Sequence, residues 1–268
     1  MFAAYGFVFS HPDGGGVRVP PASWPAVRVE VLAAAPYPHA EPLVLSSSYV
    51  GMRFREGWLE VERGSSTLRA YGEDLAPHAL VHPYLALPAT ALAHWSAAVP
   101  LHAGALVLPG GAVGVLAAKG GGKSTTMAAA RQAGLPILTD DLLVLRNGMA
   151  LAGPRSIDLR SEAARRFGGR PLGVIGGRAR WRLDLQPVAP EVPLVALVEL
   201  VWSDRPTVER LSAVERLDVL AASYALGSAV APPAALLEVA TLPMFRVGRP
   251  RELSAVGRAL EFVTALAA

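Results

Sequence analysis

The sequence predicts an α/β protein, and three observations support this prediction. In residues 101–266, short apolar segments suited to buried strands alternate with segments of helical periodicity. A glycine-rich loop separates one such strand, residues 112–117, from a helix that begins near Lys123. The first hundred residues differ, since short segments of alternating apolar and polar residues make them β-rich. This order of elements is typical of an α/β domain preceded by a smaller β-rich region.

We therefore expect two parts. Residues 1–98 form a β-rich N-terminal region, a candidate for substrate recognition, and residues 99–268 form the α/β domain. Asn147-Gly148 predicts a tight hairpin within the second part, because both residues readily adopt positive φ. The remaining elements follow from apolar periodicity and from glycine and proline breaks: strands over 103–108, 112–117, 135–139, 193–202 and 242–247, and helices over 123–133, 161–167, 213–226, 234–239 and 252–266.

Composition excludes several classes of protein. Of the 268 residues, 52% are hydrophobic and 18% charged, which excludes global disorder. The absence of cysteine excludes a disulfide scaffold, a thiolate nucleophile and a cysteine-based metal site. The N-terminus lacks a basic residue before its short apolar stretch, so it does not resemble a signal peptide. Prolines and histidines interrupt the uncharged stretch 75–118, which leaves no run of about 20 apolar residues for a membrane span. We expect a cytoplasmic protein without a membrane partner.

Basic residues are unevenly distributed. Of the 25, 23 are arginine, and the two lysines, Lys119 and Lys123, both lie in the glycine-rich loop. Residues 155–182 carry eight arginines against only Asp158 and Glu162. Two interpretations of that segment stay open: a solvated helix face, or a surface for an anionic ligand. No basic–aromatic interleaving accompanies it, so nucleic acid is not an expected partner.

The glycine-rich loop matches seven of the eight positions of the Walker A pattern, with Ala117 in place of the first glycine. Small residues let backbone N–H groups converge on phosphate oxygens, and the helix N-terminus favours an anion. A lysine at the end of the loop reaches the β- and γ-phosphates, and the following hydroxyl holds Mg²⁺. Alanine at the first position requires a negative φ there. The loop predicts an ATP site formed by Lys119, Gly120, Gly121, Gly122, Lys123, Ser124 and Thr125.

Other classes of phosphate-loop protein fit less well. The single asparagine precedes Gly148, so the guanine-reading motif of GTPases is missing, and neither glutamine lies in a transporter-type signature. A partitioning-type ATPase carries a second lysine in the loop, and Lys119 lies one residue away from that position. This ATPase class remains an alternative, as does a non-catalytic nucleotide-binding or scaffold protein.

Acidic residues follow the next strand of the domain. Asp140-Asp141 ends the strand after the loop's helix. If the two strands are parallel neighbours, their carboxyl ends bring this pair to the phosphate loop. One carboxylate then binds Mg²⁺, and the other accepts a proton from an attacking hydroxyl. A cap of a turn is the structural alternative for the pair.

Together these motifs resemble the C-terminal kinase domain of the HPr kinase/phosphorylase family, whose fold is related to phosphoenolpyruvate carboxykinase. The matching motifs are Leu101-His102-Ala103, the loop ending Gly122-Lys123-Ser124, and Leu138-Thr139-Asp140-Asp141, in the same order and spacing. The chain is most similar to the short HPr-kinase-like proteins of ribosomal peptide clusters such as those of lasso peptides, through Gly122 to Thr126, Phe245-Arg246-Val247 and Pro250-Arg251-Glu252-Leu253. The similarity covers roughly residues 100–265.

The resemblance implies an ATP- and Mg²⁺-dependent kinase that phosphorylates a hydroxyl, the serine of a peptide or small protein. It implies Asp140 as the general base, with His102 as its polar neighbour. It assigns Mg²⁺ to Ser124 and Asp141, and catalytic importance to Lys123. Within the arginine-rich segment, Arg178 and Arg180 are candidates for contacting nucleotide phosphates or an acidic substrate. Relatives assemble, so a homo-oligomer is compatible with the resemblance.

Overall fold

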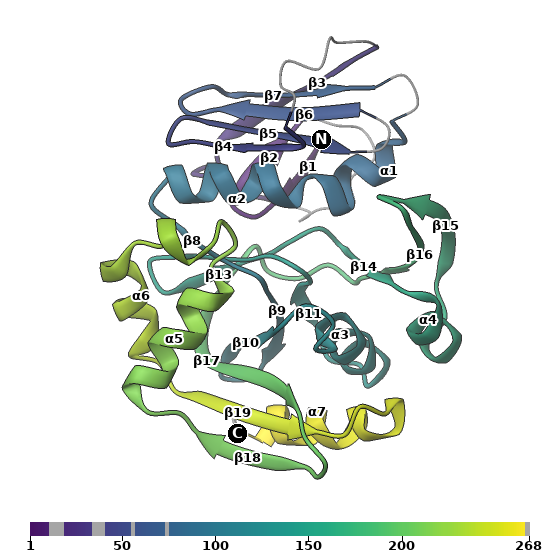
Figure 1. The fold of residues 1–268 in the computed structure, drawn as a ribbon, viewed down its shortest axis with the longest axis vertical. Helices are drawn as coiled ribbons and strands as arrows, with labels where there is room; N and C mark the ends of the chain where they lie inside the picture. Colours follow the sequence, from purple (N-terminus) through teal and green to yellow (C-terminus); the bar gives the residue numbers. More distant parts are fainter. Residues whose placement is uncertain (11–18, 34–40, 55–56, 73–74, 266–268) are drawn as a thin grey trace.

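The computed structural model describes residues 1–10, 19–33, 41–54, 57–72 and 75–265. Within these ranges the chain is a mixed α/β protein with two larger sheets and one small sheet (Figure 1). The seven-stranded sheet comes from the N-terminal region, and helix α2 lies between it and the rest of the molecule in the view of Figure 1. Helix α2 contacts strands on both sides, namely β5 and β6 above it and β8 below it.

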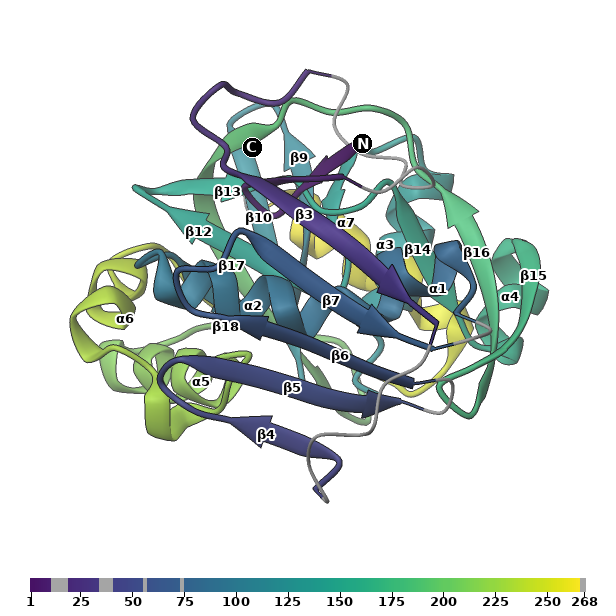
Figure 2. The same cartoon turned by 90° about the horizontal axis from the view of Figure 1, so that it is seen from above.

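The N-terminal sheet has the strand order β1-β2-β3-β7-β6-β5-β4. Strand β7 alternates partly buried and buried residues, as expected for a strand with one face against a core, whereas β6 is buried along most of its length. Figure 2 shows these strands from above, crossing over α2. Their bounds are β1 (Phe2–Ala4), β2 (Phe7–Phe9), β3 (Ala26–Leu32), β4 (Leu43–Leu45), β5 (Tyr49–Phe54), β6 (Gly57–Glu62) and β7 (Thr67–Tyr71).

The second sheet has nine strands, and the glycine-rich loop follows one of them, β10. Its path is β11-β9-β10-β17-β13-β12-β8, and β19 pairs with both β17 and β18. The long strand β17 divides the sheet, because its start pairs with β13 and its end pairs with β19. The bounds are β8 (Val99–Leu101), β9 (Ala103–Leu108), β10 (Gly111–Ala117), β11 (Ile137–Thr139), β12 (Leu143–Arg146), β13 (Met149–Leu151), β17 (Glu191–Trp202), β18 (Thr207–Arg210) and β19 (Met244–Arg249).

The sequence analysis considered the strand that ends at Asp140-Asp141 as a parallel neighbour of the strand before the glycine-rich loop. The structure shows that this pairing is wrong. Strand β9 lies between β10 and β11 and runs antiparallel to both. Strands β10 and β11 therefore point the same way without touching. The physical reason is the tight turn at Pro109-Gly110, which folds β9 back onto β10. Strand β9 therefore occupies the edge of β10 that β11 would have used. The carboxyl ends of β10 and β11 still lie at one edge of the sheet.

A three-stranded sheet in the order β14-β16-β15 carries most of the arginine-rich segment: β14 (Ser156–Leu159), β15 (Arg170–Ile175) and β16 (Arg178–Asp184). Helices α3 and α7 contact one another, with α3 on β9 and β10 and α7 on β19, whereas α5 and α6 pair elsewhere (Figure 1). The helical elements are α1 (Pro77–Ala79), η1 (Leu80–Tyr84), α2 (Ala86–Trp95), α3 (Lys123–Gln132), α4 (Ser161–Phe167), α5 (Ala213–Ser223), η2 (Ser228–Val230), α6 (Pro233–Ala240), η3 (Leu253–Ala255) and α7 (Val256–Ala265).

The N-terminal region and the rest of the chain share buried contacts. One cluster of buried apolar side chains includes residues of both. The Tyr5 N–H donates to the Ala152 carbonyl at 2.7 Å, and Trp24 Nε1 donates to Glu191 Oε1 at 2.7 Å. The division near residue 98 stays a prediction. No helix among the described ranges has both the length and the apolar character needed to cross a bilayer.

Candidate active site

The glycine-rich loop, residues 118–122, joins the buried strand β10 to helix α3. Gly120 and Gly122 have positive φ, 82° and 91°, a conformation that glycine adopts without strain. Ala117 is the last residue of β10 and keeps a strand backbone, which satisfies the condition for alanine at that position. A Cβ at Gly121 would lie 2.8 Å from the Ala117 Cβ, so the loop is too tight there for a larger residue.

The two lysines of the loop have different surroundings. Lys123 begins α3, is only 7% exposed, and donates from Nζ to the Ala117 carbonyl at 3.1 Å. Burial lowers the pKa of Lys123, while the charges of Asp141 and Asp140 act in the opposite direction. Lys119 lies on the exposed side of the loop. The buried lysine is therefore held over the loop, where a phosphate would replace the carbonyl as its partner.

Asp140 faces the N-terminal turn of α3. The Ser124 hydroxyl donates to Asp140 Oδ1 at 3.2 Å, and Asp140 is 3% exposed. Burial, followed by the charge of Asp141, raises the pKa of Asp140 to about 7. A buried carboxylate next to a second carboxylate and a loop hydroxyl fits a divalent cation, which would relieve both effects.

Asp141 faces the other way, toward His102. His102 Nδ1 lies 3.4 Å from Asp141 Oδ1, and both side chains are partly exposed. Asp141 has a φ of 73°, an unusual conformation for a residue other than glycine, and such strain is often found at functional sites. Burial, with the charge of Lys123 next in size, lowers the pKa of His102, which favours the neutral imidazole. The sequence analysis expected His102 beside Asp140, and the structure brings it to Asp141.

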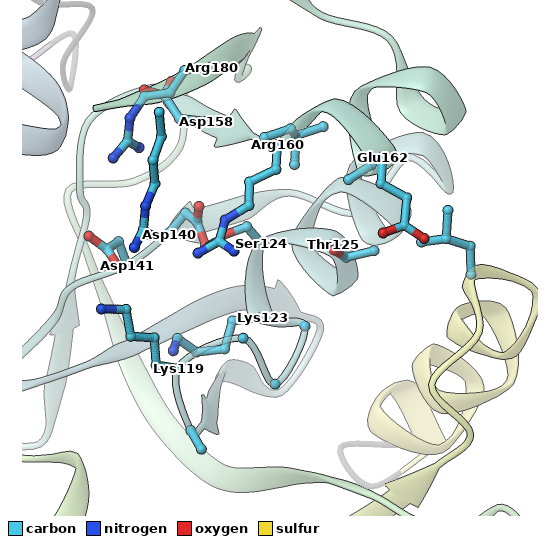
Figure 3. Close-up of a pocket in the computed structure, with 18 of the residues that line it drawn as sticks. Lys119, Lys123, Ser124, Thr125, Asp140, Asp141, Asp158, Arg160, Glu162 and Arg180 are labelled. Atoms are coloured by element: carbon cyan, nitrogen blue, oxygen red, sulfur yellow. Dashed lines mark hydrogen bonds between the residues drawn. The ribbon is translucent and has the colours of Figure 1, made fainter. Parts of the chain in front are cut away.

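All predicted site residues line one cavity of about 680 Å³. In the view of Figure 3, Lys119 and Lys123 lie below, Arg160 and Arg180 above, and Asp140 and Asp141 between them. Arg180 is half-buried on β16 and donates from Nε to the Ile175 carbonyl at 3.3 Å. The cavity therefore has the glycine-rich loop on one wall and arginines on the opposite wall.

The arginines of residues 155–182 fall into three groups: buried, exposed and lining the cavity. Arg182 and Arg155 are buried structural residues: Arg182 forms a two-bond pair with Asp158, and Arg155 donates to the carbonyls of Ile137 and Leu138 beneath the acidic pair. Arg165, Arg166 and Arg170 are exposed, whereas Arg160, Arg178 and Arg180 line the cavity. The exposed Arg165 and Arg166 of α4 fit a solvated helix face, whereas a surface for an anionic ligand stays a prediction for the arginines of the cavity.

Several cavity residues were missed by sequence reasoning. Trp202 and Arg249 end strands β17 and β19, and the segment Arg251-Glu252-Leu253 follows. His82 and Asp158 reach the cavity from η1 and β14. The sequence does indicate that Trp202 ends a long apolar strand. Only the parallel pairing of β17 with β10 shows that this strand end lies beside the loop.

Metal binding would rest on few protein ligands. Among the residues with a described position, no group of three or more His, Asp or Glu side chains forms a metal cage. Magnesium at nucleotide sites commonly takes one or two carboxylates together with substrate phosphates and waters. Asp140 and Ser124, with Asp141 nearby, fit that smaller set.

Solved structures include distant structural neighbours of the chain. No protein-family model matches the chain, and no curated protein matches its sequence. Among solved structures, the HPr(Ser) kinase/phosphatase from Coxiella burnetii is similar, with a TM-score of 0.34 and 15% sequence identity. The likeness covers 62% of this chain and 87% of that chain. It is a distant structural neighbour, and the family predicted from the motifs stays a prediction.

Proposed function

We propose that the chain is an Mg²⁺- and ATP-dependent kinase that phosphorylates a hydroxyl, the serine of a peptide or small protein. One observation carries the proposal: the Ser124–Asp140 hydrogen bond joins the phosphate loop to the acidic pair within a single cavity. Phosphoryl transfer is mainly a matter of positioning and of charge stabilisation, and this cavity has residues for both.

The loop would hold the triphosphate. Backbone N–H groups of the loop and the N-terminus of α3 would donate to phosphate oxygens. Lys123 would exchange the Ala117 carbonyl for the β- and γ-phosphates. Mg²⁺, when bound, supplies charge neutralisation at the transferring phosphoryl group.

The geometry favours exchanging the roles first assigned to the two aspartates. Asp140 is buried and bonded to Ser124, so it suits the metal. Asp141 is partly exposed, next to His102, and open to an incoming hydroxyl. We assign Asp141 as the base: the acceptor oxygen bonds to the γ-phosphorus, its proton passes to Asp141, and ADP leaves. His102 would orient that carboxylate.

The arginines opposite the loop suit an acidic acceptor. Arg178 is exposed and Arg180 half-buried on the same face of β16, and neither forms an ion pair within the described ranges. Burial lowers the pKa of Arg180, a cost that a carboxylate of the acceptor would reduce. We therefore propose an acidic serine-containing peptide as the acceptor.

The test is phosphate transfer from γ-labelled ATP to serine peptides that differ in acidity, with the wild type and Asp141→Asn in parallel. The proposal expects labelled peptide with the wild type, and about 10²–10⁴-fold less with the variant, the usual contribution of a positioned base. Retained ATP binding without any labelled peptide would indicate the alternative, a non-catalytic nucleotide-binding protein. Phosphate released without an acceptor would instead favour an ATPase.

A further inference from the structure

Three parallel strands end beside one another at the phosphate loop. Strands β10, β17 and β19 run in the same direction, with Ala117 opposite Leu200 and Trp202 opposite Arg249. The loop follows β10, Trp202 ends β17, and Arg249 ends β19. The carboxyl ends of parallel strands are where α/β sheets bind ligands. Trp202 and Arg249 therefore occupy the side of the loop that faces away from the acidic pair.

Arg249 is a buried cation without a counter-charge. It is 2% exposed, its Nε has no hydrogen-bond partner, and no carboxylate of the described residues pairs with it. Burial lowers the pKa of Arg249. Burying an unpaired charge costs free energy. An anion bound next to Arg249 would pair with that charge and reduce this cost.

The guanidinium of Arg249 lies directly against the loop. A Cβ placed on Gly122 would overlap Nη2 of Arg249, so only glycine allows this approach. Gly122 precedes Lys123, the first residue of α3. The cation is thus held next to the backbone that would receive a phosphate chain.

Trp202 provides aromatic surface at the same place. Its ring lies beneath the Arg249 guanidinium, with Cζ 4.3 Å from the ring centroid, while the residue stays 39% exposed and lines the cavity. Arg251 approaches the same ring, with Cζ 5.9 Å from the centroid. An exposed tryptophan among arginines is a surface on which a planar base can stack.

We propose that Trp202 stacks against the base of a purine nucleotide and that Arg249 donates to its phosphate oxygens beside Gly122. The nucleotide would then extend from Trp202 across the loop, with its terminal phosphate at the acidic pair. This inference rests on the proposed function, because it assumes that the loop binds a nucleotide. It adds which residues contact the base and which contact the phosphates.

The experiment measures dissociation constants by calorimetry for Mg·ATP and for Mg·tripolyphosphate, which has the phosphates but no base. The variants are Trp202→Ala, Trp202→Phe and Arg249→Gln, with Arg210→Ala on the exposed strand β18 as a matched control. Circular dichroism establishes that each variant is folded.

We expect Trp202→Ala to weaken ATP binding about tenfold, the size of one stacked base, and to leave tripolyphosphate binding unchanged. Trp202→Phe should restore most of the loss. Arg249→Gln should weaken both ligands by about tenfold or more, whereas the control should change neither. Nucleotide should also quench tryptophan fluorescence in the wild type and much less in Trp202→Ala.

Equal ATP affinity in the wild type and Trp202→Ala would overturn the assignment of the base, and unchanged tripolyphosphate binding in Arg249→Gln would overturn that of the phosphate contact. Either result leaves the proposed function standing, because the wild type still binds ATP. If the wild type binds neither ligand, the proposed function fails together with this inference.

Discussion

The Ser124 hydroxyl donates to Asp140 Oδ1 across 3.2 Å, and this bond connects the first turn of α3 to the end of β11. The two strands that lead to these residues are not neighbours, because β9 lies between them. The loop and the acidic pair meet because both β10 and β11 end at the same edge of the sheet. The predictions that follow depend on this meeting point.

Replacing Asp140 should stabilise the nucleotide-free protein. Burial raises the pKa of Asp140 to about 7 in the folded chain, against its ordinary value of 3.8. The folded state therefore favours the protonated form, and this contribution to stability is lost as the pH rises from about 4 through 7. We expect Asp140→Asn to raise Tm in EDTA, by an amount that grows from about pH 5 to about pH 8. A difference that is constant or shrinks over that range would contradict the raised pKa. Asp184→Asn, at an exposed position, is the control.

The two aspartates should differ in what they do for catalysis. Asp141→Asn should keep Mg²⁺-dependent ATP binding and reduce kcat by about 10²–10⁴-fold, because it removes the proposed base. Asp140→Asn should instead weaken the Mg²⁺ dependence of ATP binding, measured by titrating Mg²⁺ at fixed ATP. If Asp140→Asn lost turnover and Asp141→Asn lost the Mg²⁺ dependence, Asp140 would be the base and Asp141 the metal ligand, as the sequence analysis expected.

The two lysines should differ as well. Lys123→Ala should reduce kcat/KM by about 10²-fold or more, because it removes a cation held over the phosphate site. Lys123→Arg should not rescue it, because a planar guanidinium differs in shape and donor geometry from a compact ammonium. Lys119→Ala should stay close to wild type, because Lys119 is exposed. Steady-state kinetics with varied ATP measures all three, and a large loss in Lys119→Ala would show that both lysines contact the nucleotide.

Arg182 should be a major contributor to stability. It pairs with Asp158 at 2.8 and 3.0 Å and also donates to the carbonyls of His78 and His82, which ties η1 to the three-stranded sheet. Arg182→Ala should lower the free energy of unfolding by about 3–5 kcal/mol, because it leaves a buried carboxylate unpaired.

Urea denaturation measures this loss. Arg170→Ala, at an exposed position on β15, serves as the control and should change stability by less than about 0.5 kcal/mol. The double variant Arg182→Ala/Asp158→Ala should lose less than the sum of the two single variants, because the second substitution removes the unpaired charge. Additive losses would mean that the pair is not coupled.

Arg180 should act on the acceptor and not on the nucleotide. Arg180→Ala should raise KM for an acidic peptide about tenfold and leave KM for ATP unchanged, because it removes one charged contact. For a neutral peptide, Arg180→Ala should raise KM much less. An equal rise in both KM values would assign Arg180 to the nucleotide instead.

The sequence by itself determined the local structure around the loop. Strand β9, helix α4 and the hairpin at Asn147-Gly148 follow from apolar periodicity and from turn residues, because these are short-range effects. The glycine-rich loop was equally visible, since glycines, lysine and serine are contiguous there, and its binding of phosphate stays a prediction.

Only the tertiary structure decided which residues meet across the cavity. The insertion of β9 beside β10, the pairing of His102 with Asp141, and the approach of Arg249 to Gly122 join residues far apart in the chain. Strand order and side-chain direction depend on packing of the whole sheet, and a one-residue change in register reverses the face on which a side chain lies. The motifs therefore indicate the chemistry, while the sheet assigns each residue its partner.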